Sequence, residues 1–184
     1  MKKIFTILFL VISTSIFSQS LFDKYEDMDN VTSILINSKM FKMLGDMNID
    51  SGDSEADVLI NQFKSLNSLT VYSTNDNEVS RSISDDVDSY VELKNLEELM
   101  RIKEGNQNIK FYVKSGSKEY MVDELLMFVT GNNNSVVGAR SYDTVLLSLL
   151  GNIDLRTISN LTQKLDVPGG GALNNVSNGR KTRR

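Results

Sequence analysis

The 184-residue chain contains no histidine and no cysteine, and 40% of its residues are hydrophobic against 24% that are charged. This composition is typical of one globular domain with a hydrophobic core. The two missing residue types exclude a Ser-His-Asp triad, a Cys-His dyad, thiolate or imidazole metal sites, and disulfide bonds. Most hydrolase mechanisms are therefore excluded, and the stability of the fold must come from its core.

The formal net charge of -4 conceals an uneven distribution. All 24 acidic residues lie between Asp23 and Asp166, and that segment holds 14 of the 20 basic residues, which gives it a formal charge of -10. Such an acidic body is expected to repel nucleic acids and anionic lipid surfaces.

Residues 1–19 are typical of a secretory signal peptide. Two lysines precede an apolar run from Ile4 to Ile12, and a stretch rich in small residues follows up to Ser20. The run is too short for a transmembrane anchor, which needs roughly 20 apolar residues. We expect cleavage between Ser18 and Ser20. Because no cysteine is present to carry a lipid anchor, the expected location is the periplasm, the cell surface or the medium.

The next part of the chain alternates strand and helix patterns. Val31 to Asn37 predicts a strand, and Ser38 is expected to cap the helix that follows. That helix has a continuous apolar side made of Met40, Phe41, Met43, Leu44 and Met47. We interpret the methionines as adaptable core packing, and a promiscuous binding surface is the alternative.

A second helix is expected from a capping box at Ser54 to Asp57, which Leu59, Ile60, Phe63 and Leu66 continue. Leu69 to Ser73 predicts a second strand. Apolar residues at helical spacing then predict a helix from about Ser80 to Lys94.

Beyond Lys94 the pattern favours strands. Glu98 to Lys103 either finishes the helix or begins a strand. The loop Glu104 to Asn108 and the alternating run Ile109 to Lys114 favour a hairpin. After a turn at Ser115 to Lys118, Tyr120 to Val129 predicts a strand that the polar loop Gly131 to Ser135 ends.

The most strongly patterned stretch is Tyr142 to Leu165. Val145 to Leu150 is an aliphatic run interrupted by Ser148 alone, which indicates a strand covered on both faces in the middle of a sheet. Gly151 and Asn152 are expected to break that strand. Asp154 is expected to cap a helix with Leu155, Ile158, Leu161 and Leu165 at helical spacing.

Together these patterns predict a single α+β domain over residues 20–166, with helices packed on a mainly antiparallel sheet and a C-terminal strand-helix unit. Residues 167–184 contain the one proline, three consecutive glycines and four basic residues, and no periodic apolar set. We expect a disordered basic tail there. It could contact phosphates or acidic surfaces, although a solvated tail is the favoured interpretation.

One segment has the oxygen spacing of a calcium loop. Asp46, Asn48 and Asp50 alternate along the chain, and Asp57 follows, so these four residues are the candidate metal ligands. The segment departs from the EF-hand pattern because Ser51 replaces the glycine and Asp57 replaces the longer closing glutamate. A solvated acidic loop is the favoured interpretation, and no other cofactor is expected.

Other candidate sites are weaker. Ser115 and Lys118 have the S-x-x-K spacing of serine acyl-transfer enzymes, but they fall in a predicted turn and lack the other motifs of those enzymes. The carboxylates of Asp85, Asp86 and Asp88 and those of Glu97 and Glu98 lie on or near the exposed side of a predicted helix, and we interpret them as solvated charge. Paired carboxylates for glycoside hydrolysis stay an open alternative, because such partners need be close only in space.

Several phrases together resemble a known family. The start LFDKYEDMDNVTSILINSKMFKML, the stretch YVELKNLEELMRIKEG, the segment VDELLMFVTG and the ending LLGNIDLRTISNLTQKL are similar to the Bacteroidota secreted family catalogued as domain of unknown function 4252. The similarity spans about Phe22 to Leu165. It implies an exported α+β body without established activity or catalytic residues, and a link with regulators of the envelope through partner binding. Some members carry a lipid-anchor cysteine, which this chain lacks.

The expected function is therefore that of a non-enzymatic exported envelope protein that binds a protein or peptide partner. One alternative is a carboxylate- or calcium-dependent hydrolase acting on cell-surface glycan, which requires a concave pocket with two or more carboxylates of perturbed pKa. Another is a small ligand or lipid carrier, which requires an apolar cavity. The oligomeric state is left open.

Overall fold

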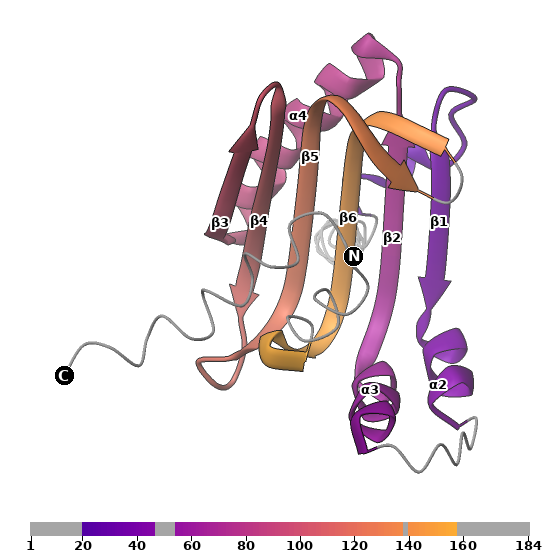
Figure 1. Cartoon of the computed structure of the whole chain (residues 1–184), viewed down its shortest axis with the longest axis vertical. Helices are drawn as coiled ribbons and strands as arrows, with labels where there is room; N and C mark the ends of the chain where they lie inside the picture. Colours follow the sequence, from indigo (N-terminus) through magenta and orange to yellow (C-terminus); the bar gives the residue numbers. More distant parts are fainter. Residues whose placement is uncertain (1–19, 47–53, 138–139, 158–184) are drawn as a thin grey trace, which may run out of the picture.

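A computed structural model describes residues 20–46, 54–137 and 140–157, and these residues form one open sheet with helices around it (Figure 1). The sheet order is β1-β2-β6-β5-β4-β3, and every neighbouring pair is antiparallel. The elements are η2 (Asp23–Tyr25), β1 (Thr32–Asn37), α2 (Ser38–Asp46), α3 (Ser54–Lys64), β2 (Leu66–Thr74), α4 (Asn77–Lys94), β3 (Glu97–Glu104), β4 (Gln107–Ser115), β5 (Met121–Val137) and β6 (Arg140–Asp154). The predicted α+β class is confirmed.

The predicted interior strand is β6. It lies between β2 and β5, and Val145, Leu146 and Leu149 are buried, although they point to opposite faces of the sheet. The consecutive strands β3 to β6 form a meander, whereas β2 pairs with β6 although β3, β4 and β5 lie between them in the sequence. The C-terminal strand therefore connects the two halves of the sheet.

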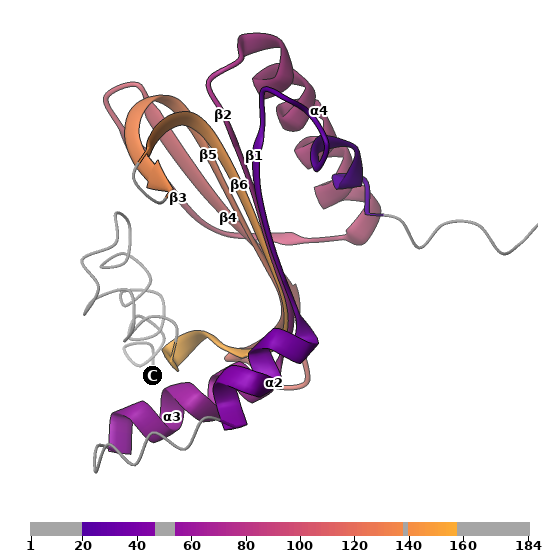
Figure 2. The same ribbon diagram turned by 90° about the vertical axis from the view of Figure 1, so that its right-hand side faces the viewer.

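Helix α4 covers one face of the sheet (Figure 2). Its buried residues Ile83, Val87 and Tyr90 recur at helical spacing and pack on Leu126 and Leu146 of the sheet. The helix begins at an N-cap, Asp76, whose side chain accepts hydrogen bonds from two backbone N–H groups. It ends at Asn95 in the left-handed conformation.

A chain segment before β1, residues 20–30, packs on the same side as α4, and we call it the strap. Phe22 and Tyr25 are buried there, and the ring of Phe22 lies 4.9 Å from that of Tyr90. The Tyr25 hydroxyl donates to Asp86 at 2.5 Å, and the Lys24 ammonium lies 2.6 Å from the same carboxylate. The strap is thus fastened to α4 by aromatic packing and by Asp86.

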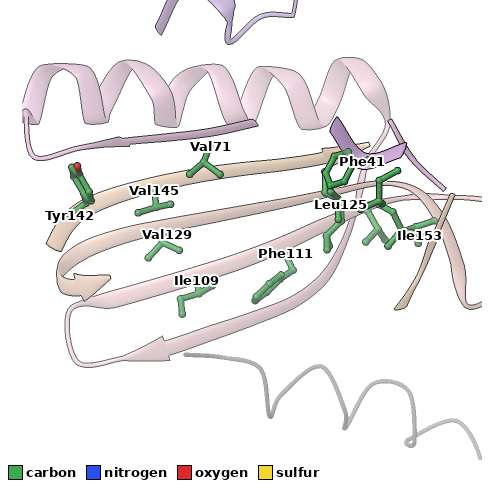
Figure 3. Close-up of a cluster of buried hydrophobic side chains, with 13 residues drawn as sticks. Phe41, Val71, Ile109, Phe111, Leu125, Val129, Tyr142, Val145 and Ile153 are labelled. Atoms are coloured by element: carbon green, nitrogen blue, oxygen red, sulfur yellow. The ribbon is translucent and has the colours of Figure 1, made fainter. Parts of the chain in front are cut away.

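The other face carries a second apolar cluster, which runs along the length of the strands (Figure 3). It includes Val71, Ile109, Phe111, Val129 and Val145. Helices α2 and α3 lie at the foot of the sheet, where Phe41 joins the cluster (Figure 2).

Some predicted boundaries are wrong because the strands continue past residues that favour turns. The expected loop Gly131 to Ser135 lies within β5, where the register against β6 shifts between Thr130 and Ser135. Gly151 does not end its strand either, since β6 continues to Asp154. The hairpin after α4 is confirmed as β3 and β4, which decides against the helical alternative for Glu98 to Lys103.

The C-terminal strand-helix unit is confirmed as far as the structure describes it. Residues 155–157 are helical, and Asp154 Oδ1 accepts the backbone N–H of Arg156 at 3.0 Å, as a helix N-cap does. The rest of that helix, the predicted signal peptide and the basic tail lie outside the described residues. Within the described ranges, no helix has the length and apolar character needed to cross a membrane.

Candidate functional site

The two edge strands of the sheet differ in charge. Strands β3 and β1 lie at the two edges (Figure 1). Five of the eight residues of β3 are charged, whereas the six residues of β1 include none. Charged side chains on an edge strand prevent pairing with another chain, and an uncharged edge leaves its backbone groups available for it. Among the described strands, β1 pairs with β2 alone, so its outer edge is open.

Two apolar side chains of β1 are exposed, one on each face of the sheet. Ile34 is 39% exposed and Leu35 is 50% exposed, and adjacent residues of a strand point to opposite faces. A chain that paired with β1 could therefore bury apolar surface above and below its backbone hydrogen bonds.

Helix α2 continues this surface at the foot of β1. Asn37 caps the helix, because its side-chain oxygen accepts the backbone N–H groups of Lys39 and Met40 at 3.1 Å each. The prediction that Ser38 is the cap is therefore wrong by one residue. Phe41 points inward and stacks on Phe63 with ring centroids 6.3 Å apart, which fixes the rotation of α2.

That rotation leaves two methionines outside. Met40 and Met43 are exposed, Met43 by 58%, so the interpretation of these two residues as core packing is wrong. Met47 lies outside the described residues. The alternative interpretation, an adaptable binding surface, fits the exposed pair.

The candidate calcium ligands stay a prediction. Asp46 ends α2, and its carboxylate lies 3.4 Å from the Lys64 ammonium, while Asp57 belongs to α3. Asn48 and Asp50 lie outside the described residues. In the described part of the chain, no three acidic residues come together as metal ligands.

The carboxylates on α4 differ from one another. Asp85 and Asp88 are exposed as predicted, but Asp86 is partly buried because it binds Tyr25 and Lys24. The hydrogen bond from Lys24 to Asp86 raises the pKa of Lys24, and burial raises the pKa of Tyr25. The solvated interpretation is therefore wrong for Asp86, which fastens the strap.

Sequence reasoning missed one buried carboxylate. Glu124 on β5 is 4% exposed and accepts a hydrogen bond of 2.8 Å from the Tyr90 hydroxyl. Burial raises the pKa of Glu124, and the Tyr90 hydrogen bond opposes that shift. A signal was present, because strand alternation places Glu124 on the same face as Leu126 and Phe128, which are apolar and belong to the cluster under α4.

A pocket of about 610 Å³ lies between the strap, the end of α4 and strands β2 and β6. Ser148, the one polar interruption of the aliphatic run, lines it beside its cross-strand neighbour Thr70. Asp23 is the one carboxylate among the described residues that line it, so the paired carboxylates of a hydrolase are not gathered there.

Ser115 ends β4 and Lys118 follows in the turn, so the predicted turn is confirmed and the helical turn of an S-x-x-K enzyme is not formed.

The described residues thus define an α+β protein built on one open antiparallel sheet, with a charged edge and an uncharged one. The chain belongs to the family described as Domain of unknown function (DUF4252), which matches residues 25–161. Neither a curated protein nor a solved structure matches the chain.

Proposed function

We propose that the protein is an exported, non-enzymatic module that binds a protein or peptide partner by adding a strand of that partner to β1. The observation that supports this most directly is the uncharged outer edge of β1, with Ile34 and Leu35 exposed on its two faces. In strand addition, backbone hydrogen bonds supply affinity and alternate side chains supply specificity. The link to envelope regulation that the family resemblance implies is part of this proposal.

The exposed methionines extend the proposed surface beyond the strand. Met40 and Met43 lie one helical turn apart on α2, directly after β1. Unbranched thioether side chains adapt to irregular partner surfaces. A partner strand would therefore form backbone hydrogen bonds with β1. Its apolar side chains would contact the methionines of α2.

Export is expected to leave a mature N-terminus between Ser18 and Ser20, because residues 1–19 have the three regions of a signal peptide. The measurement is the intact mass and N-terminal sequence of the protein recovered from the envelope and the medium of expressing cells. A recovered chain that still begins with Met1 would contradict export by a cleaved signal.

A photo-crosslinking amino acid at position 35 is expected to capture a defined protein in cells, because Leu35 lies in the middle of the open edge. The same amino acid at position 101, on the charged β3 edge, is the matched control and should capture little. With the captured partner purified, Leu35→Lys should weaken its binding at least tenfold by placing a charge on the edge. Arg101→Gln should leave the affinity unchanged.

Equal capture from positions 35 and 101 would contradict strand addition at β1. So would an unchanged affinity in the Leu35→Lys variant, provided that its circular dichroism and urea denaturation match those of the wild type. Because Leu35 is half-exposed, this substitution should not unfold the domain.

A further inference from the structure

Exposed apolar side chains are concentrated at the β1 edge. Seven large hydrophobic side chains are exposed in the described part of the chain, and five of them lie between Met28 and Met43. Resting on the proposed function, we infer that the partner strand comes from a second copy of this chain. The two β1 strands pair antiparallel about a two-fold axis and join the two sheets into one.

Symmetry restricts the register of this pairing. A two-fold axis perpendicular to the sheet keeps each face on its own side, so directly opposed residues must share a face. An axis at Leu35 places Leu35 against its copy and Ile34 against Ile36 of the second copy. An axis at Ile34 would instead place Leu35 against Ser33. The first register pairs apolar side chains at its three central positions and is the one we propose.

Two segments flank β1: the beginning of α2, which we call the first flank, and the segment that enters β1, which we call the second. In this register, the first flank of each copy meets the second flank of the other. Because the strands run in opposite directions, the beginning of α2 in one copy lies beside the segment that enters β1 in the other. The first flank carries exposed Lys39 and Lys42, and the second carries exposed Asp27 and Asp29. Opposite charges thus meet at both ends of the interface, although each body is acidic overall.

The apolar residues of the flanks match in the same way. Met40 and Met43 lie among the lysines of the first flank, and Met28, also exposed, lies between the aspartates of the second. Apolar contact and charge complementarity therefore occur at the same positions. Exposed ion pairs contribute little affinity individually, so here they set orientation and register.

The mature chain is expected to have twice its monomer mass by sedimentation equilibrium at micromolar concentration. Leu35→Lys should give a monomer, because it places two like charges face to face on the axis. Leu93→Lys is the matched control, since Leu93 is 72% exposed at the end of α4, away from β1, and this variant should stay dimeric. A monomeric wild type, or equal dissociation by both variants, would overturn the inference.

A charge exchange tests the register itself. The variant Asp27→Lys/Asp29→Lys and the variant Lys39→Asp/Lys42→Asp should each dimerise about tenfold more weakly, because like charges then meet at both flanks. An equimolar mixture should restore dimerisation as a heterodimer, since every flank contact in it joins opposite charges. Failure of the mixture to recover would rule out this register.

The crosslinking experiment separates the two proposals. An adduct at position 35 with the mass of two copies supports the dimer. An adduct with a different protein, together with a monomeric mature chain, overturns the dimer and leaves strand addition at β1 standing. The absence of any adduct at position 35 overturns both.

Discussion

Replacing Gly151 by alanine is expected to lower the free energy of unfolding by about 2–4 kcal/mol. Gly151 has a φ of +145°, which side-chain-bearing residues rarely adopt. A Cβ at this position would lie 2.5 Å from the backbone oxygen of Ser65 and 2.7 Å from Leu66 Cα. The backbone of β6 must therefore move away from β2. Urea denaturation followed by circular dichroism measures the loss.

Gly105→Ala is the matched control. Gly105 also has a positive φ, +57°, but a Cβ there would meet no heavy atom within 4 Å. The free energy of unfolding of this variant should therefore fall by only about 1 kcal/mol, which is the cost of placing an alanine in the left-handed region. Equal losses in the two variants would show that the close approach of β6 to Ser65 does not restrict position 151.

Removing the Tyr90 hydroxyl with Tyr90→Phe is expected to destabilise the fold by about 2–3 kcal/mol at pH 7. The hydroxyl donates to Glu124, which is buried, and its loss leaves the Glu124 carboxyl without that donor. The phenylalanine ring keeps the packing against Phe22. Urea denaturation at a series of pH values measures the effect.

The same pair predicts a pH dependence of stability. Burial raises the pKa of Glu124 above its ordinary value, so in the folded protein this carboxyl binds a proton at a pH where the unfolded chain has released it. The contribution of Glu124 to stability is therefore present at low pH and is lost as the pH rises through the raised value. The cost of Tyr90→Phe should shrink on acidification, because a protonated carboxyl tolerates burial better.

Two variants check this assignment. Glu124→Gln should remove the Glu124 part of the pH dependence, since the amide does not titrate. Tyr25→Phe should cost only about 1 kcal/mol, because Asp86 keeps its ion pair with Lys24 and is partly solvated. A Tyr90→Phe penalty that stays constant with pH would contradict a charged Glu124 in the folded protein.

The sequence predicts the existence of strands and helices better than it predicts where they end. The aliphatic run around Leu146 and the helical spacing of Ile83, Val87 and Tyr90 come directly from burial on both faces of a strand or on one side of a helix, so both were identified. Glycine and asparagine signals near Gly131 and Gly151 failed to mark strand ends. Gly151 stays paired with Leu66 of β2, whereas after Thr130 the register is irregular and pairing with β6 resumes at Ser135.

The candidate surface depends on information that no local pattern contains. The uncharged string TSILIN and the charged string EELMRIKE are visible in the sequence, but their meaning depends on which strands lie at the edges. That order follows from the pairing of β2 with β6, which are distant in the chain. Likewise, the exposure of Met43 depends on the rotation of α2, which the contact of Phe41 with Phe63 fixes.

The position of β6 also determines when the domain can fold. Among the described strands it is the last to be synthesised, yet it lies between β2 and β5. Until residues 140–154 are available, no strand joins the pair β1-β2 to strands β3, β4 and β5, and pairings between distant segments form slowly. A nascent chain should therefore remain unfolded until residues 140–154 emerge, which is the state that the proposed export would require, and fragments that stop before β6 should be degraded.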